Sequence, residues 1–366
     1  MNNKIKIFIM AGEASGDVLG ASVMRSFGNQ AEFRGIGGMN MTSAGLKSIF
    51  PMADLSVMGL SAVIARIWTL LRRIRQAADA IKKWNPDVVL SIDSPGFAKA
   101  VAKKIGKGNG AKLYHFVAPQ VWAWRAGRAK KFAKLFDRLY CFFDFEVPYF
   151  TKFGLPTIPV GHPIADGEIR NFIGRKRDNK MIALLPGSRP AEVAAHMPLL
   201  GAVAENFPGY KIMVPVADPV RAQVVAAAKS WNAKPIFAAS QNRYSVFADA
   251  ALAVVASGTA SAELAVLHTP AVVVYKTSAL TYWGFRLVSK IKFVSLVNII
   301  MGRKIYPEFL QHNATANNVI MSAHKILDDD AVREKMISEL ESADKIWSLG
   351  GLPASDILRD DLIKSL

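Results

Sequence analysis

The sequence of 366 residues contains a single cysteine, Cys141, and no long uncharged apolar run. One cysteine cannot make an internal disulfide or a cysteine-rich metal site, so the chain suits a reducing compartment. No uncharged run reaches the ~18 apolar residues that a membrane span needs. The apolar run Ile7–Met10 is also too short for the core of a secretory signal. We therefore expect a cytoplasmic chain, unless it lies on a membrane surface.

Acidic residues are scarce, since 29 Asp and Glu oppose 46 Lys and Arg and leave a formal charge of +17. Such a balance attracts anions, which include nucleic acids, anionic lipids and phosphorylated substrates. A nucleic-acid binder would need a recognisable module, and zinc-finger spacing, an RNP motif and a basic zipper are all missing. The six histidines show no metal-ligand spacing, so we predict no protein-held metal, no cofactor and no nucleic-acid partner.

The length suggests two domains. Apolar segments alternate with helical patterns in two successive series, which indicates an α/β fold with parallel sheets. We predict two doubly wound, Rossmann-like domains facing a central cleft, with ligands at the carboxyl ends of the strands. The predicted boundaries are 1–165 for the N-terminal domain, 170–345 for the C-terminal domain and 346–366 for a terminal helix. Proline, glycine and charge over 161–178 indicate a linker.

The tract Leu185-Pro186-Gly187-Ser188-Arg189 follows a predicted strand and precedes a predicted helix. Glycine lets backbone N–H groups approach a phosphate, and the start of a helix favours negative charge. Arg189 could then bind a diphosphate through its forked guanidinium. The alternative is an ordinary turn with a surface arginine.

The tract Ser257-Gly258-Thr259-Ala260-Ser261-Ala262-Glu263 has the same strand-turn-helix pattern. Glu263 falls about one turn into the helix, where its carboxylate could accept hydrogen bonds from ribose hydroxyls. Alternatively, Glu263 only complements the helix dipole. Two turns of the phosphate-binding type in one half of the chain favour nucleotide binding, although a Walker motif and a dinucleotide fingerprint are both missing there.

In the first half, two tracts follow predicted strands. Gly12, Glu13, Ser15, Gly16 and Asp17 form a glycine-rich turn, which could bind an anionic acceptor or be purely structural. Asp93 ends a strongly apolar strand, where a carboxylate would face the cleft and could act as general base. Otherwise it caps the loop before Pro95.

Aromatic and basic residues follow the next predicted strand. Trp122, Trp124 and Arg125 could form an apolar wall with an anion-binding end, or could simply pack. His162 lies at the predicted domain junction and could line the cleft.

The long predicted helix 64–84 begins as an apolar and basic segment. This composition is typical of a helix that lies on anionic lipid. An amphipathic core helix with a basic outer face would have the same composition. The segment 282–293 has a similar composition. The predicted membrane-facing residues are Ile64, Arg66, Ile67, Trp68, Leu71, Arg72 and Arg75.

Taken in order, these motifs resemble lipid-A-disaccharide synthase. The resemblance covers about residues 5–345 and rests on 11–17, 57–60, 92–97, 121–125, 161–163, 184–189, 257–263 and 295–303. It implies an inverting glycosyltransferase with the two-domain GT-B fold. It also implies that UDP-2,3-diacylglucosamine and 2,3-diacylglucosamine 1-phosphate (lipid X) are joined by a β-1,6 bond, with release of UDP, at the cytoplasmic face of the inner membrane.

The resemblance also assigns residues. Asp93 matches the base for the acceptor 6-hydroxyl, Arg189 the diphosphate contact and Glu263 the ribose contact. The other donor-side residues are Gly187, Ser188, Ser257, Gly258, Thr259, Tyr275, Asn298, Arg303 and Gln311, and Met58 and Gly59 join the acceptor side. The terminal helix would return to the first domain.

The chain departs from the family pattern at Gly96, Ala98 and Ala62. Many relatives carry an aspartate at the position of Gly96, so a second carboxylate is missing here. Three alternatives stay open: a UDP-GlcNAc 2-epimerase, another GT-B glycosyltransferase, or a non-catalytic basic protein that binds membrane or RNA. The sequence also leaves open whether the chain is a monomer or a homodimer.

Overall fold

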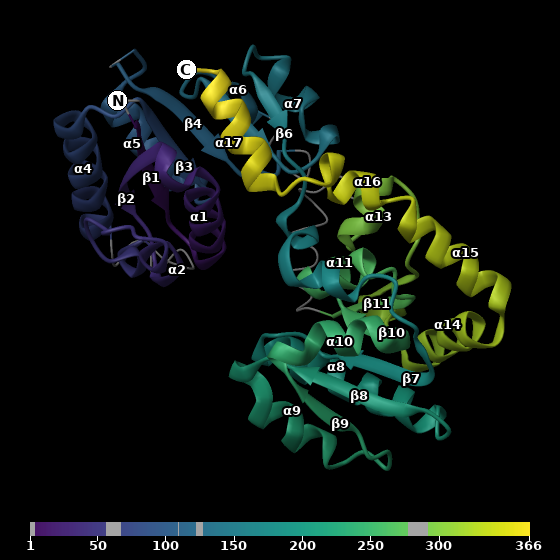
Figure 1. Cartoon of the computed structure of the whole chain (residues 1–366). Coiled ribbons are helices and arrows are strands. Elements are labelled where there is room, and N and C mark those ends of the chain that lie inside the picture. The colour runs from purple at the N-terminus through teal and green to yellow at the C-terminus, as the bar shows by residue number, and fades with distance from the viewer. Residues whose placement is uncertain (1–3, 56–66, 109, 122–126, 277–291) are drawn as a thin grey trace. The chain divides into compact units, whose positions relative to one another are not determined.

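The computed structural model describes residues 4–55, 67–108, 110–121, 127–276 and 292–366. The chain divides into two compact units: unit 1 is Met1–Pro163 with Ser348–Leu366, and unit 2 is Ile164–Trp347. Each unit is built on a six-stranded parallel sheet with helices between the strands (Figure 1). The predicted α/β class with two doubly wound units is therefore confirmed.

In unit 1 the strand order is β2-β1-β3-β4-β5-β6, and every neighbouring pair is parallel. The strands are β1 (Ile5–Ala11), β2 (Ala31–Ile36), β3 (Val88–Ile92), β4 (Lys112–Phe116), β5 (Arg138–Cys141) and β6 (Thr157–Pro159). The helices are α1 (Ala14–Phe27), α2 (Met39–Ser43), α4 (Ile67–Trp84), α5 (Pro95–Ile105), α6 (Gly127–Ala133), α7 (Pro148–Thr151) and α17 (Ala354–Lys364).

Alternation along the strands fills both faces of this sheet. Ile7 and Ile9 belong to one buried cluster, whereas Phe8 and Met10 belong to another. Successive side chains of a strand point to opposite faces, so helices cover the sheet on both sides. This explains why the central strand β3 is apolar and buried throughout, as parallel strands usually are.

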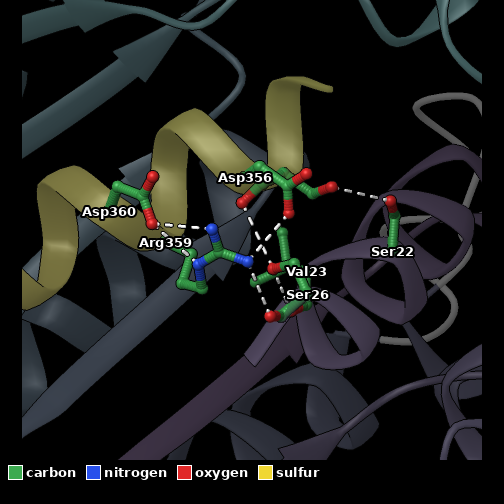
Figure 2. Close-up of polar contacts among 7 residues, drawn as sticks. Ser22, Val23, Ser26, Asp356, Arg359 and Asp360 are labelled. Carbon is green, nitrogen blue, oxygen red and sulfur yellow. Dashed lines mark hydrogen bonds and ion pairs between the residues drawn. The ribbon is translucent and has the colours of Figure 1, made fainter. Parts of the chain in front are cut away.

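The chain end completes unit 1. Leu358 and Leu362 of α17 join the cluster that contains Ile7 and Ile9. Polar contacts fix the helix against α1: the Arg359 guanidinium donates to the Ser26 carbonyl at 2.9 Å, and the Ser22 and Ser355 hydroxyls lie 3.1 Å apart (Figure 2). Residues 348–366 are therefore part of the first unit, although they follow the second along the chain.

In unit 2 the strand order is β12-β11-β10-β7-β8-β9, again all parallel. The strands are β7 (Asp178–Leu185), β8 (Lys211–Val216), β9 (Ile236–Ala239), β10 (Ala250–Ala256), β11 (Ala271–Tyr275) and β12 (Glu308–Leu310). The helices are α8 (Pro190–Asn206), α9 (Arg221–Ala228), α10 (Arg243–Asp249), α11 (Thr259–Val266), α13 (Leu296–Met301), α14 (Ala316–Asp328), α15 (Asp330–Glu341) and α16 (Asp344–Trp347).

The predicted linker 161–178 contains two short 3₁₀ helices, Pro163–Ala165 and Gly167–Phe172, and leads into β7. The unit boundary falls at Pro163, and the 3₁₀ helix Gly167–Phe172 contacts α10 and buries Ile169. Proline and glycine in this stretch shape short 3₁₀ turns, which is why its composition resembles that of a linker.

Both sheets have a topological switch point, where the chain reverses the direction in which it adds strands. In unit 1 this point lies between β1 and β3, and in unit 2 it lies between β7 and β10. Ligands of open α/β sheets bind outside the carboxyl ends of the strands at such points. The turns after β1, β3, β7 and β10 are therefore the places to examine.

Candidate functional site

In unit 1, Asp93 follows β3 at the switch point, next to the turn after β1. Its Oδ2 accepts a hydrogen bond from the Ser15 hydroxyl at 2.8 Å, and its Oδ1 accepts from the Ser94 N–H at 2.8 Å. The side chain is half-buried. Ser15 therefore orients a partly exposed carboxylate at the sheet edge where a ligand would bind, which is the geometry that a general base needs.

Two glycines bring the turn after β1 close to Asp93. A β-carbon on Gly12 would lie 2.5 Å from Ser94 Oγ and 2.7 Å from Ser94 Cβ. One on Gly16 would lie 3.1 Å from the Ile92 carbonyl oxygen. The glycines of this tract therefore permit one turn to pack on the other, which shapes the surroundings of Asp93.

Left-handed backbone is concentrated at this edge. Asp93, Ser94 and Val117 have φ values of +54°, +45° and +79°. Such values cost non-glycine residues free energy, above all a β-branched one. Asn85 and His268 are also left-handed, but they lie at helix ends, where this conformation is common. Strain at the ends of β3 and β4 has no such local explanation and fits a functional edge.

Glu13 adds a second carboxyl group near Asp93. Partial burial raises the pKa of Glu13, and repulsion from the Asp93 carboxylate raises it further. The carboxyl groups of Glu13 and Asp93 therefore interact. Glu13 provides a second carboxyl group near Asp93, whereas Gly96 provides none.

Asp17 stabilises the start of α2. It is buried and accepts hydrogen bonds from the N–H groups of Gly38, Asn40 and Met41 and from the Asn40 side chain. Burial acts to raise the pKa of Asp17, but these hydrogen bonds outweigh it and hold the pKa below its usual value. The carboxylate caps α2 and is committed to protein contacts, so the structure gives no support to its predicted role at the acceptor site.

His162 packs against the rings of Phe142 and Phe143, with centroid distances of 4.5 and 5.6 Å. Burial lowers the pKa of His162 to about 4, so the ring is neutral at physiological pH. Its place at the cleft stays a prediction. Seven predicted residues lie outside the described part of the chain: Met58, Gly59, Ile64, Arg66, Trp122, Trp124 and Arg125.

The first turns of α4 expose apolar side chains among basic ones. Ile67, Trp68 and Leu71 are 37%, 81% and 50% exposed, and Arg72 and Arg75 are exposed beside them. Arg73 points inward instead and pairs with Asp54 at 2.6 Å. Because α4 connects β2 to β3, it runs antiparallel to the strands and starts at their carboxyl edge. The exposed apolar residues therefore lie toward the same edge as Asp93.

No helix among the described residues is both long and apolar enough to cross a bilayer. In the same ranges, no group of three or more His, Cys, Asp or Glu side chains is arranged to hold a metal ion.

In unit 2, a cavity of about 330 Å³ opens at the carboxyl ends of β7, β8 and β10. Its size falls within the range of small-molecule sites. It brings together most of the predicted donor-side residues, namely Gly187, Ser188, Arg189, Ser257, Gly258, Thr259 and Glu263. Pro215, Val216 and Phe247 form part of its apolar lining.

The N–H groups of the turn before α8 already bind a carboxylate of the protein, that of Glu192. Glu192 Oε2 accepts hydrogen bonds from the N–H groups of Ser188 at 3.1 Å and Arg189 at 3.3 Å. Gly187 has φ of +108°, and a β-carbon there would lie 2.5 Å from Glu192 Oε2. Gly187 therefore lets the Glu192 carboxylate approach the turn, and a contact of Gly187 with a phosphate stays a prediction.

The Arg189 side chain is nevertheless available to a ligand. It is 75% exposed, and its one partner among the described residues is Glu192, at 3.3 Å. An ion pair this exposed contributes little to stability, so the guanidinium can turn to a stronger anion in the cavity.

The start of α11 is different because its N-cap is Gly258, which has no side chain to cap the helix. The first N–H groups of a helix have no partner within it. Gly258, Thr259 and Ala260 line the cavity, whereas the Ser257 hydroxyl turns away to the Val294 carbonyl at 3.1 Å. Within the described ranges no side chain caps this helix start, so it, rather than the start of α8, can present N–H groups to an anion.

Glu263 lies one turn further along α11 and is only 7% exposed. Its Oε1 accepts from Arg243 Nε at 3.1 Å and from the Tyr244 hydroxyl at 3.3 Å. Oε2 accepts no hydrogen bond from any described residue, so it can receive hydroxyl groups from a ligand. Arg243 also lines the cavity. The sequence did not predict this residue, because no sequence pattern links it to Glu263, which lies 20 residues away along the chain.

The remaining donor-side residues do not line this cavity within the described ranges. Tyr275 is the last residue of β11, and Gln311 follows the neighbouring strand β12 with φ of +50°. Arg303 pairs with Glu339 at 2.7 Å on the surface.

Asn298 is fully buried and hydrogen-bonded on both sides. Its Nδ2 donates to the Tyr306 carbonyl and to Glu308 Oε1, both at 2.8 Å, and its Oδ1 accepts from two backbone N–H groups. In this structure, Asn298 holds the chain between α13 and β12 together. Direct contacts of Asn298 and Arg303 with a donor stay predictions.

Comparison with known proteins gives a consistent family. The model of the family described as lipid-A-disaccharide synthetase matches residues 7–347. A lipid-A-disaccharide synthase of Rhodospirillum centenum is 36% identical, covering 95% of this chain and 92% of the relative. One of Gluconobacter oxydans is 36% identical, covering 95% and 88%.

Solved structures share the fold at low identity. A UDP-GlcNAc 2-epimerase of Neisseria meningitidis, bound to UDP-GlcNAc, has a TM-score of 0.62 at 13% identity, covering 98% of this chain and 100% of that one. MurG of Acinetobacter baumannii has a TM-score of 0.63 at 12% identity, covering 99% and 100%. These likenesses show the two-unit fold and leave the reaction to other evidence.

Proposed function

Because this chain belongs to the lipid-A-disaccharide synthetase family, we propose that it joins UDP-2,3-diacylglucosamine to 2,3-diacylglucosamine 1-phosphate by a β-1,6 bond. It is a glycosyltransferase of lipid A biosynthesis. The detailed proposal rests on the two switch points. The one in unit 1 has the Asp93 carboxylate, which Ser15 orients, and the one in unit 2 has a cavity lined by the start of α11 and by Arg189.

The cavity of unit 2 would hold the UDP moiety. The uncapped start of α11 and the exposed Arg189 provide positive potential for the diphosphate. Glu263 Oε2 would accept from the ribose hydroxyls while Arg243 holds Oε1. The apolar lining near Val216 and Phe247 suits the flat face of a base.

In the reaction, Asp93 would take the proton of the acceptor 6-hydroxyl as its oxygen attacks the anomeric carbon of the donor. The bond from that carbon to the diphosphate breaks, the configuration inverts, and UDP leaves with the bonding electron pair. The N–H groups of α11 and Arg189 would stabilise the charge that develops on the diphosphate. We propose that these groups neutralise it without a metal ion or other cofactor.

The carboxyl edge of unit 1 would face the lipid. Trp68 and Leu71 expose apolar surface beside Arg72 and Arg75, a combination that suits the interface of an anionic membrane. These residues support our proposal that the enzyme is a peripheral protein; its position on the cytoplasmic face of the inner membrane is proposed from the family resemblance alone.

Binding to vesicles tests this placement. Changing Trp68 and Leu71 to serine should reduce co-sedimentation with anionic vesicles severalfold. Met321→Ser changes a similarly exposed apolar residue on α14 of unit 2 and is the matched control. Equal binding by all three proteins would contradict the membrane-facing role of α4.

The activity itself is tested by incubating the enzyme with both sugar substrates and measuring UDP and disaccharide. Asp93→Asn should lower the rate by ~10²–10⁴-fold, as expected on loss of a general base, while UDP affinity stays unchanged. A fall of less than tenfold would remove Asp93 from that role. Epimerisation of UDP-N-acetylglucosamine without any disaccharide would favour the epimerase alternative instead.

A further inference from the structure

His196 is a fully buried polar residue of α8 whose ring joins two loops of unit 2. Its Nδ1 lies 2.9 Å from the carbonyl oxygen of Pro186, and its Nε2 lies 3.0 Å from the backbone nitrogen of Lys276. Pro186 follows β7, and Lys276 follows β11. The strand β10 lies between those two strands, so the ring bridges the turns on either side of the one that leads into α11.

The two contacts define one protonation state. A carbonyl oxygen only accepts, so Nδ1 must carry hydrogen, and a backbone N–H only donates, so Nε2 must not. Burial lowers the pKa of His196; the Pro186 carbonyl and the Glu192 carboxylate act to raise it, and the Lys276 ammonium acts to lower it. The neutral ring with hydrogen on Nδ1 is therefore the form that makes both bonds.

The same helix holds the turn before it from a second direction. Glu192, four residues before His196, accepts from the N–H groups of Ser188 and Arg189. Residues four apart lie on one face of a helix. Two residues on one face of α8 therefore bind the Pro186–Arg189 turn. Glu192 accepts from the N–H groups of Ser188 and Arg189, and His196 donates to the carbonyl of Pro186.

We propose that His196 is a positioning residue of the donor site, which fixes the Pro186–Arg189 turn relative to the end of β11 so that Arg189 stands beside the start of α11. This inference rests on the proposed UDP site and deepens it. His196 does not line the cavity itself, so it acts through the backbone that carries Arg189.

The test compares two variants of His196 by titration with UDP at neutral pH, well below their melting temperatures. His196→Phe keeps a flat ring but removes both hydrogen bonds. His196→Asn is smaller but keeps an N–H near the position of Nδ1. One lost hydrogen bond is worth a factor of roughly 2–10 in a binding constant, so UDP should bind about tenfold more weakly to the Phe variant and about threefold more weakly to the Asn variant.

The order of the two variants separates positioning from packing. A residue that only fills space would be replaced better by phenylalanine than by the smaller asparagine. A Kd for the Phe variant equal to or below that of the Asn variant would overturn the proposal, as would Kd values within twofold of the wild type in both. The control His324→Asn changes an exposed histidine of α14 and should leave UDP binding unaltered.

Two further outcomes remain decisive. Failure of the wild type to bind UDP would overturn the proposed function and this inference with it, whereas normal binding by both variants overturns the inference alone. If neither variant folds, hydrogen exchange on the wild type decides. UDP should then slow exchange at the Lys276 amide as well as at the Pro186–Arg189 turn, and protection of the turn alone would refute the coupling.

Discussion

Replacing Gly12 with alanine tests whether the close approach of two turns shapes the catalytic edge. The new β-carbon would lie 2.5 Å from Ser94 Oγ and 2.7 Å from Ser94 Cβ. Carbon contacts are ordinarily ~3.5–4.0 Å, so one turn must move by about 1 Å. A hydroxyl could rotate away, but Cβ is fixed to the backbone next to Asp93, so the backbone itself must move.

We expect two measurable losses. Overpacking of this kind costs about 1–3 kcal/mol of stability, which thermal unfolding will detect. A shift of about 1 Å in a catalytic group can cost ~10²-fold in rate, so initial rates of UDP release should fall by at least tenfold at saturating substrates.

The matched control is Gly96→Ala, because no atom of the described part of the chain lies within 4 Å of the β-carbon it would add. Alanine is also the better residue in a helix such as α5, so this variant should be as stable as the wild type or more so. Adding Ser94→Gly to Gly12→Ala removes both close contacts and relieves φ of +45°, and should restore stability. If Gly12→Ala alone kept more than half of the wild-type rate, the reasoning from this contact would be refuted.

Three further substitutions test single contacts. Asp17→Asn should cost ~2–3 kcal/mol of stability at neutral pH, since hydrogen bonds to a charged group are strong. Because the pKa of Asp17 is lowered in the fold, this difference should persist above about pH 4 and shrink as the pH falls through the folded pKa; a difference that stays constant down to pH 2 would contradict the capping role. Glu192→Gln should tighten UDP binding by about two- to fivefold, because Arg189 loses its competing carboxylate; weaker binding would show that Glu192 instead orients Arg189. Glu263→Gln should weaken UDP binding about tenfold, whereas Glu32→Gln, which alters an exposed ion pair of unit 1, should not; equal effects would remove Glu263 from the ribose site.

The strands were predictable because parallel strands buried on both faces are continuous apolar runs, and β3 and β10 are buried at every position. Once the strands are located, the residues after them are known to share an edge. This is why Asp93 and the two turns of unit 2 could be singled out before any coordinates. The sequence could also suggest the return of the chain end to unit 1, but only through the family resemblance.

The contacts of particular carboxylates could not be predicted, because each depends on which N–H groups the fold brings near. Asp17 looked like part of a ligand-binding turn but caps α2, which begins more than twenty residues later. Glu192 lacked the usual signature of a capping box, in which Ser or Thr precedes by three residues, since Arg189 occupies that position. Arg243 meets Glu263 only through the packing of α10 on α11.

The two helix starts at the switch point of unit 2 divide the work of anion binding. The α8 start is filled by Glu192 and tied down by His196, so the turn that carries Arg189 is ordered without a ligand. The α11 start has glycine at its cap and no side-chain cap from any described residue, so its first N–H groups can donate to a bound anion. In the site that we propose, a ligand with two phosphates would accept from those N–H groups and pair with Arg189 at the same time. The preference for a nucleoside diphosphate that we propose for this cavity would thus follow from one helix start capped by Glu192 beside another that has glycine at its cap.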